Sequence, residues 1–382
     1  MASSSTPYLL IVRNGPVWDL EKTLSFFSRT FGAHFEGEIC TYGVEKGFFS
    51  AAGFDVRRFK WPKGGPVGRA GYIAWILGRA MKARWIKGRK LVVIAYDPFQ
   101  SGMIGALAKR LTGATFICEV NGVYGDDDNL IDMPDPEARA ERKRSMLRFG
   151  SKVLKHADFV KVLYPEQLKG FDEAVLDKPR TWFFDLIDAD TFQPRGLAPE
   201  KRIVFAGHPF MRKGLDILLQ AWARTRGDFP EWSLNLVGWG IEEPAREKEL
   251  PTDGVEFVPP QTPEELARLI EASEGLILPS RSEGMGRVLL EAALLGRPRL
   301  GSRVGGIPYY IDHGVDGLLF EPADVDALEA ELRRFMSDEE LRARMGVAAR
   351  KRAVESFTSQ EYVRRYGEVV ESLTGWAPPT LD

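Results

Sequence analysis

Short apolar runs alternate with helical patterns along this chain, and no other feature limits the fold as strongly. In the first half, four runs of strand length end near Asn, Asp, Gly or Pro turn signals, at residues 8–13, 91–96, 115–120 and 159–163. Helical patterns, among them 104–111 and 139–154, separate them. Strands that alternate with helices predict parallel βαβ units and an α/β fold.

The second half of the chain repeats this pattern. Four further runs are predicted as strands, at residues 203–206, 234–237, 255–258 and 275–278. Thr262, followed by Pro263 and by Glu265 three positions on, predicts a capped helix start.

A linker is predicted near residues 193–200, between two doubly wound parallel-sheet domains. We expect an N-terminal domain at 1–195, a C-terminal domain at 196–357 and a C-terminal helix at 358–382 that packs back toward the first domain. Ligands of open parallel sheets bind at the carboxyl ends of the strands, so we expect the site in a cleft where the two domains face each other.

Composition excludes several classes of protein. No apolar run approaches the roughly 20 residues of a membrane-spanning helix. Two cysteines, Cys40 and Cys118, exclude a disulfide framework and a Cys-rich zinc site. The first residues lack the features of a secretory signal, so a cytoplasmic protein is expected.

Charge is divided unevenly between the two halves. Residues 1–195 hold 29 basic and 23 acidic side chains, a net charge of +6, whereas the remainder holds 23 basic and 31 acidic side chains, a net charge of −8. Opposite signs predict two domains with different partners.

The strongest chemical signal is the segment 280–292, which follows a predicted strand and enters a helix. Gly284 and Gly286 flank Met285 and allow the backbone to approach a ligand closely, and amide groups at a helix start suit a diphosphate. Glu283 and Glu291 supply carboxylates that can accept hydrogen bonds from sugar hydroxyls. By itself the segment also fits a structural glycine turn.

A second signal lies at residues 205–216, where a strand ends at a glycine and cations precede a helix. His208, Arg212 and Lys213 stand in this loop, and Lys213 is a compact charge that can bind a phosphate. A third signal, at 304–311, has two adjacent glycines and a proline. Taken alone, the second segment also reads as an exposed basic loop and the third as a turn.

In this order, the segments resemble glycosyltransferase family 4, the retaining nucleotide-sugar transferases of the GT-B fold with two Rossmann-like domains. The family pattern has a Lys-Gly pair, then Glu-Gly-x-Gly with a second Glu eight positions on, then Gly-Gly-x-Pro and Gly-Leu-Leu. The resemblance covers residues 200–357. It implies that Lys213 binds the donor diphosphate, Glu291 the ribose and Glu283 the transferred sugar, while Arg281 and Ser282 flank the site.

The chain departs from the family pattern at several positions. His208 replaces an Arg near the phosphates, and Arg212 is expected to compensate for it. Gly15 is what is left of a two-glycine loop after the first strand, and Asn121 replaces a His of the N-terminal domain. Both are still predicted to contribute to donor binding.

Asp126 and Asp128 form an Asp-x-Asp pattern of the kind that binds metal in another glycosyltransferase fold. A solvated loop is the preferred interpretation, because Lys213 and the helix start already neutralise the leaving group. We therefore expect no metal and no cofactor.

The stretch from Val56 to Tyr96 contains eleven Lys and Arg and no Asp or Glu. The helical pattern at 70–86 places Trp75 beside Arg79 and Lys82, a combination that suits an anionic membrane surface. We therefore expect residues 56–96 to bind such a surface or an anionic acceptor, with the protein peripheral at the inner face of the membrane. No recognised nucleic-acid module is present. An ordinary helix that covers the sheet is the alternative.

The sequence thus predicts a retaining, metal-independent glycosyltransferase of polysaccharide or other glycan biosynthesis. Its donor is expected to be a nucleotide sugar, UDP-linked in preference to GDP-linked, and its acceptor a lipid-linked or cell-surface glycan precursor. The resemblance implies front-face attack by the acceptor hydroxyl. Two alternatives stay open: a nucleotide-sugar epimerase on the same fold, and a catalytically inert scaffold subunit.

Overall fold

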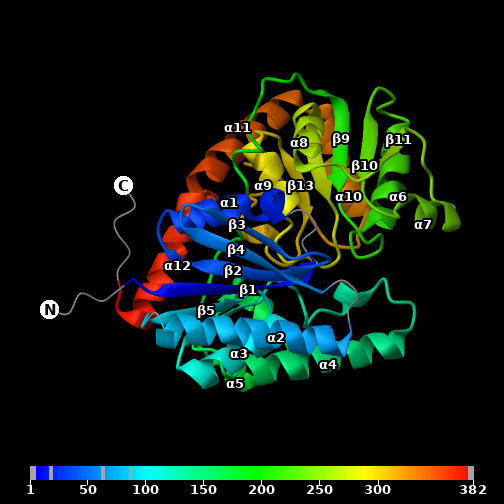
Figure 1. Cartoon of the computed structure of the whole chain (residues 1–382). Coiled ribbons are helices and arrows are strands. Elements are labelled where there is room, and N and C mark those ends of the chain that lie inside the picture. Colours follow the sequence, from blue (N-terminus) through cyan, green and yellow to red (C-terminus); the bar gives the residue numbers. More distant parts are fainter. Residues whose placement is uncertain (1–5, 17–19, 62–64, 87, 377–382) are drawn as a thin grey trace. The chain divides into compact units, whose positions relative to one another are not determined.

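The computed structural model describes residues 6–16, 20–61, 65–86 and 88–376 (Figure 1). These residues form two compact units. Unit 1 contains Met1–Gly125, Arg144–Leu186 and Ser359–Asp382, and unit 2 contains Asp126–Lys143 and Ile187–Thr358. The chain therefore passes between the units more than once, and the segment Asp126–Lys143 belongs to unit 2 although its flanks belong to unit 1.

Unit 1 is built on an eight-stranded sheet in the order β3-β4-β2-β1-β5-β6-β7-β8. All neighbours pair in parallel except β3 and β4, which are antiparallel at one edge. The strands are β1 (Tyr8–Pro16), β2 (Glu36–Gly43), β3 (Gly47–Ala51), β4 (Phe54–Lys60), β5 (Leu91–Ala95), β6 (Thr115–Glu119), β7 (Phe159–Val162) and β8 (Arg180–Trp182).

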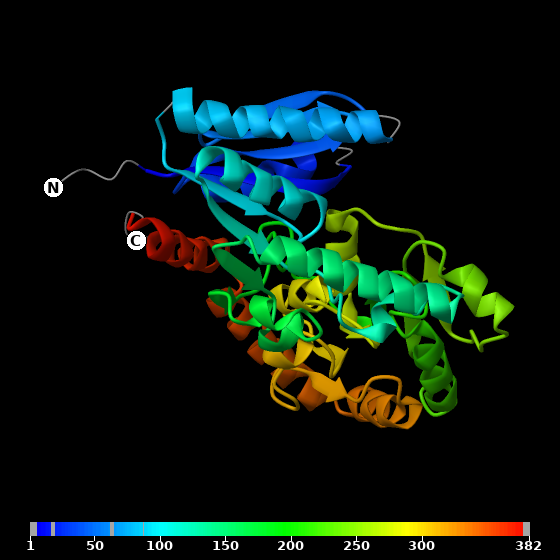
Figure 2. The same cartoon turned by 90° about the horizontal axis from the view of Figure 1, so that it is seen from below.

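Helices cover both faces of this sheet. The α-helices of the first 186 residues are α1 (Leu20–Gly32), α2 (Pro66–Met81), α3 (Gln100–Thr112), α4 (Pro136–Leu154) and α5 (Glu173–Leu176). Shorter turns are η1 (Lys82–Ile86), η2 (Asp127–Leu130) and η3 (Pro165–Leu168). Figure 2 shows α2 and α3 side by side, and their core residues pack on one face of the sheet.

The C-terminal helix α12 (Ser359–Thr374) packs within unit 1. Its residues Tyr362, Tyr366 and Val370 are buried in one cluster with Leu9 and Phe31, on the face of the sheet opposite α2. This helix belongs to unit 1 because its apolar stripe recurs every three or four residues and needs a partner surface.

Unit 2 is built on a six-stranded, fully parallel sheet in the order β11-β10-β9-β12-β13-β14. The strands are β9 (Glu200–Ala206), β10 (Ser233–Val237), β11 (Val255–Val258), β12 (Ser273–Leu278), β13 (Arg299–Ser302) and β14 (Leu318–Phe320). The helices are α6 (Leu215–Arg226), α7 (Glu242–Glu247), α8 (Pro263–Glu271), α9 (Arg287–Leu294), the turn η4 (Ile307–Tyr309), α10 (Val325–Ser337) and α11 (Glu339–Ser356). Such a sheet needs helices on both faces.

Local sequence signals set several of these boundaries. The Thr262 side chain accepts from the amide of Glu265, and the Glu265 carboxylate accepts from the amide of Thr262, so the predicted capping box is present. The carboxylate of Glu271 accepts from the amides of Gly196 (2.8 Å) and Leu197 (3.2 Å) and ties the predicted linker to unit 2.

Two expectations need correction. Strands β2, β3 and β4 were not expected, because polar residues interrupt their hydrophobic pattern. The expected surface face of α2 is also wrong. Trp75 packs on the ring of Phe59 at 5.5 Å, and Arg79 forms an ion pair with the buried Glu38, so both side chains are half-buried against the protein.

Candidate functional site

Each sheet has one place where the strand order reverses, and ligands of doubly wound sheets bind beside the strand ends there. In unit 2 the reversal lies between β9 and β12. The loop after β9 contains His208, Arg212 and Lys213, and the loop after β12 contains Glu283 and Gly284. The topology therefore brings two of the three sequence signals to one edge of one sheet.

Lys213 and Glu283 form an ion pair across this edge. Their side chains are 13% and 14% exposed, so the charges lie close to the surface but are largely shielded from water. Burial alone raises the pKa of Glu283, but Lys213, Arg212 and the amide of Gly286 together hold that pKa below its usual value. The carboxylate stays ionised, and the pair presents an ammonium group next to a helix start.

Arg281 connects the two loops. Its guanidinium donates to both carboxylate oxygens of Asp216 at 2.7 Å and to the carbonyl of Met211 at 2.6 Å. Its own amide donates to the carbonyl of Arg212 at 2.8 Å. Bidentate pairs of this kind fix geometry as well as charge, so Arg281 holds the loop that carries Lys213. The family resemblance implied only a flanking place for Arg281.

Glycines allow the loops to approach each other. Gly214 has a positive φ of 70°, and a Cβ there would lie 2.0 Å from the carbonyl oxygen of Pro279. Gly305, in the third motif, would place a Cβ 1.7 Å from the carbonyl oxygen of Glu283. These close contacts require glycine. The third motif, at residues 304–311, therefore packs directly against the backbone of the Glu283 loop.

The start of α9 presents amide groups next to the ion pair. Gly286 is the N-cap in a left-handed conformation, with φ 66°. Met285 is buried, and Tyr310 donates a hydrogen bond of 2.6 Å to its carbonyl, so this residue anchors the loop to the interior. Burial raises the pKa of Glu291, which lies in this helix, and Arg287 opposes that shift.

A pocket of about 280 Å³ opens at the same edge of the sheet, beyond β9. Gly238 and Ile241, which follow β10, and Phe257 and Pro259, at the end of β11, are among its lining residues. No residue of this pocket was among the predicted site residues. The strand at 234–237 was predicted, but the hollow after it depends on two neighbouring strands and leaves no local signal.

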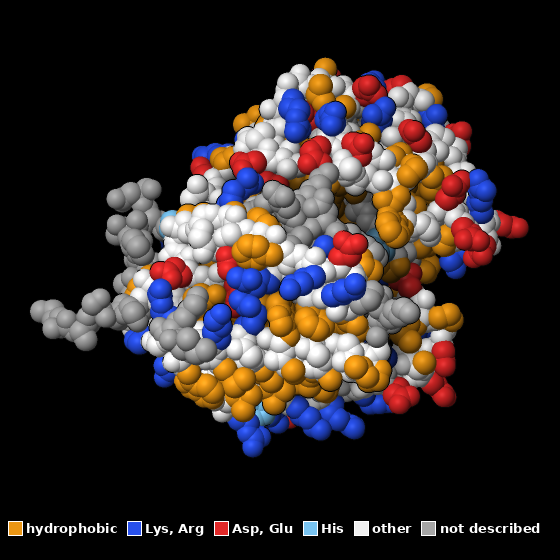
Figure 3. All heavy atoms as spheres, viewed as in Figure 1, with side chains coloured by type: hydrophobic (Ala, Val, Ile, Leu, Met, Phe, Trp, Pro, Cys, Tyr) orange, Lys and Arg blue, Asp and Glu red, His pale blue; other side chains and the backbone are white. Residues whose placement is uncertain are grey.

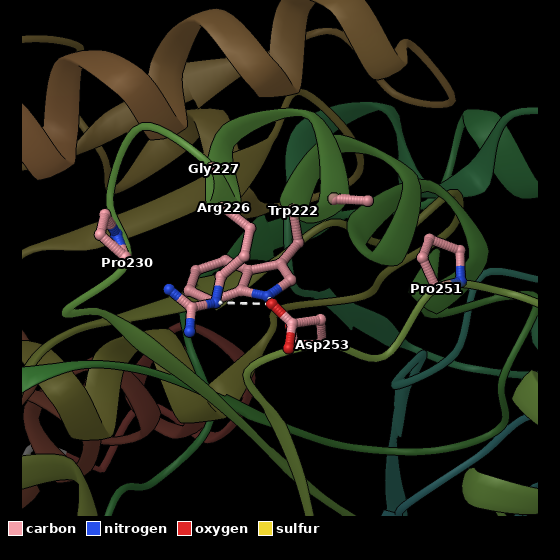
Figure 4. A pocket seen from close by; sticks show the side chains of 7 residues that line it. Trp222, Arg226, Gly227, Pro230, Pro251 and Asp253 are labelled. Carbon is pink, nitrogen blue, oxygen red and sulfur yellow. Dashed lines mark hydrogen bonds and ion pairs between the residues drawn. The ribbon is translucent and has the colours of Figure 1, made fainter.

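A larger pocket of about 430 Å³ lies at the opposite edge of unit 2, where strands begin (Figure 4). Trp222 and Arg226 line it from α6, and Arg226 pairs with Asp253 at 3.3 Å. The indole of Trp222 donates to the carbonyl of Asp253 at 2.9 Å. This pocket lies at the amino ends of the strands, whereas the loops that carry Lys213 and Glu283 lie at the carboxyl ends.

The Asp-x-Asp residues have structural contacts. Asp126 accepts from the amide of Asp128 at 3.1 Å and caps η2, and Asp127 pairs with Lys143 at 2.8 Å. Burial and then Asp126 raise the pKa of Asp128. Across the described part of the chain, no group of three or more His, Cys, Asp or Glu side chains is arranged to hold a metal ion.

The two remaining predicted residues, Gly15 and Asn121, lie in unit 1. Gly15 is in β1, at the point where that sheet reverses, but only the backbone is described there. Asn121 follows β6 and donates to the carbonyl of Tyr96 (3.1 Å) and to Glu119 (3.0 Å).

A buried cluster of charges that sequence analysis missed lies beside Asn121. Lys161 is 3.7 Å from Glu119 and forms a second ion pair with Asp185. Burial raises the pKa of Glu119 to about 7, and Lys161 opposes that shift. Residues that meet from different strands leave no signal in local spacing.

Comparison with known proteins finds a family model that matches part of unit 2. Residues 188–352 match the family model described as "Glycosyl transferases group 1". This match lies within unit 2 and covers less than half of the chain. The resemblance to glycosyltransferases expected from the motifs is thereby confirmed for this part of the chain, which holds Lys213, Glu283 and Glu291.

Curated relatives include a named glycosyltransferase and a named synthase. The D-inositol 3-phosphate glycosyltransferase of Nocardiopsis dassonvillei is 28% identical over 65% of this chain and 63% of its own length. The N-acetyl-alpha-D-glucosaminyl L-malate synthase of Bacillus anthracis is 41% identical over 26% of each chain. The chain thus matches less than two thirds of the length of these relatives.

Solved structures match nearly the whole chain. Sucrose-phosphate synthase from Thermosynechococcus elongatus has a TM-score of 0.76 and 19% identity, and covers 97% of this chain and 99% of its own. HepE from Anabaena, solved with UDP-glucose, has a TM-score of 0.71 and 16% identity, and covers 97% and 100%. The expected fold class, two parallel-sheet α/β domains of GT-B type, is confirmed.

Proposed function

We propose that this protein is a retaining glycosyltransferase that transfers a sugar from a nucleoside diphosphate to an acceptor hydroxyl. The observation that carries the proposal is the Lys213–Glu283 ion pair beside the start of α9, at the reversal point of the sheet of unit 2. An ammonium group and helix-start amides stabilise the negative charge that develops on a departing diphosphate.

Each part of the donor has a counterpart at this edge. Lys213, Arg212 and the Gly284–Gly286 amides are proposed to bind the diphosphate, with Glu283 at the sugar and Glu291 at the ribose. The 280 Å³ pocket after β10 and β11 is next to the β9 loop and is proposed to hold the base. Metal-independent transfer is proposed because Lys213 supplies the positive charge. A UDP-sugar is preferred to a GDP-sugar, and HepE provides a fold neighbour solved with UDP-glucose.

The test is incubation with UDP- and GDP-sugars, followed by measurement of released nucleoside diphosphate and of the sugar product by NMR. Release of UDP with an α-linked product from an α-linked donor supports the proposal. Conversion of the donor into its epimer without release of UDP supports the epimerase alternative. Absence of any nucleotide binding would favour a scaffold and reject the proposal.

We further propose that unit 1 binds the acceptor at an anionic membrane surface. Within the described residues, no helix is both long and apolar enough to cross a bilayer. A band of hydrophobic side chains does lie over α2, bordered by Lys and Arg (Figure 3). Exposed apolar residues in this region are Val67 (86%), Trp85 (62%), Leu107 (36%) and Leu111 (47%).

This surface replaces the face predicted from sequence. Lys82 and Arg110 are exposed beside the apolar residues, whereas Arg79 is committed to Glu38 and Lys87 is outside the described residues. Apolar side chains among cations match an interface with anionic lipids, and each cation near such a surface contributes about 1 kcal/mol.

Flotation with vesicles of phosphatidylglycerol and phosphatidylcholine tests this surface. Wild type should float at low salt and less at high salt, because surface charges are screened over about 8–10 Å. Trp85→Ser with Lys82→Glu should abolish flotation. Trp239→Ser, which removes an equally exposed indole from unit 2, is the control. If wild type does not float with these vesicles at low salt, the proposed membrane surface is rejected and a soluble acceptor is favoured.

A further inference from the structure

The acidic segment Asp126–Lys143 contacts the loop that carries Lys213. It leaves unit 1 after Gly125, contains η2 and the start of α4, and is part of unit 2. Within the segment, the carboxylate of Asp126 accepts from the amide of Asp128, and Asp127 pairs with Lys143. Another acidic residue of the segment, Asp132, is engaged with the loop after β9.

Asp132 accepts two consecutive backbone hydrogen bonds from that loop. Its Oδ1 accepts from the amide of Met211 at 2.8 Å, and its Oδ2 accepts from the amide of Arg212 at 3.0 Å. Asn129 adds a third contact, because its Oδ1 accepts from Nη1 of Arg212 at 3.3 Å. The two residues directly before Lys213 therefore have their amides held by one carboxylate.

The carbonyl groups of the same two residues are held from the other side. Arg281 donates to the carbonyl of Met211 through its guanidinium and to that of Arg212 through its backbone amide. The backbone at 211–212 is thus fixed by Asp132 at its donors and by Arg281 at its acceptors. Lys213 follows this doubly held stretch and pairs with Glu283.

We infer that Asp132 is a positioning residue, which fixes the backbone before Lys213 so that its ammonium group is aligned for the donor diphosphate. The inference rests on the proposed function. Asp132 occupies the backbone amides of 211 and 212. The groups proposed to bind phosphate are different: the side chains of Arg212 and Lys213 and the amides of Gly284–Gly286. Asp132 therefore supports the site and does not compete for its ligand groups.

Calorimetric titration of the full chain with UDP tests the inference. Asp132→Ala should raise the dissociation constant about 5- to 30-fold, the size expected for the loss of one or two hydrogen bonds to a charged acceptor. Asp132→Asn retains one acceptor oxygen and should recover part of the affinity. Asp135→Ala is the matched control, because Asp135 is exposed in the same segment and caps the amide of Glu137 at 2.9 Å without touching the loop.

Hydrogen exchange gives a readout that does not depend on UDP. The amides of Met211 and Arg212 should exchange faster in both Asp132 variants and at the wild-type rate in Asp135→Ala. In turnover, Asp132→Asn should raise the donor KM more than it lowers kcat, which a general loss of stability would not do.

The outcomes separate the possible failures. Wild type that binds no UDP would reject the proposed function and this inference with it. Wild type that binds UDP, with Asp132→Ala binding equally well, would overturn the inference alone. Tighter binding by Asp132→Ala would also overturn it, because the carboxylate would then be a competitor of the diphosphate.

Discussion

Replacement of Lys213 by alanine tests the donor site most directly. In the free protein its ammonium group neutralises Glu283, and both side chains are more than four-fifths buried. A charge-assisted contact with a phosphate contributes about 1.5–3 kcal/mol, so Lys213→Ala should weaken UDP binding roughly 10- to 150-fold.

The variant also leaves the Glu283 carboxylate without its main partner. Because burial then acts on that group with less opposition, its pKa should rise, and any charge that remains should repel the diphosphate. Glu283→Gln in the Lys213→Ala background removes this repulsion and should recover part of the UDP affinity. Glu283→Gln alone should bind UDP normally and lose turnover of the UDP-sugar.

Isothermal titration with UDP at pH 7.5 and low salt measures these affinities. Lys201→Ala is the matched control, because Lys201 forms an exposed ion pair with Glu231 at 3.0 Å in the same unit and lies before the β9 loop. Thermal unfolding reports whether each variant is folded. A folded Lys213→Ala protein with wild-type affinity for UDP would refute the reasoning.

Three further predictions follow from other parts of the structure. In urea unfolding, Glu119→Gln should gain stability relative to wild type as pH rises from about 5 to 7. The pKa of Glu119 is raised in the native protein, so the native carboxyl holds a proton that the unfolded chain releases in this range. A difference in unfolding free energy that stays constant with pH would contradict this. Turnover should survive EDTA, and Asp126→Asn with Asp128→Asn should keep donor affinity; loss with chelator, restored by Mg²⁺ or Mn²⁺, would show a metal requirement. Glu271→Ala should lower the free energy of unfolding by about 1–2 kcal/mol in the same assay, because the amides of Gly196 and Leu197 lose their carboxylate acceptor. An unchanged unfolding midpoint would reject that role for Glu271.

Contacts between nearby residues could be predicted from the sequence. The Thr262 capping box depends on residues three positions apart, and the strand at 255–258 is bounded as predicted, because local backbone geometry sets both. The two glycine loops were also found, since each follows its own strand directly. Position after a strand was enough to expect Lys213 and Glu283 at a strand end.

Contacts between distant segments were decided only by the tertiary structure. Arg79 reads as a solvent-facing cation until the sheet order places Glu38, 41 positions away, beneath it. Asp132 belongs to an acidic loop with no local signal, and its role depends on a loop 79 positions later. Periodicity reports which face of an element is apolar, but the partner of a polar side chain depends on which strands become neighbours. The sequence by itself therefore determined the α/β units, the family resemblance and the loops of the site, while the fold decided which charges hold those loops in place.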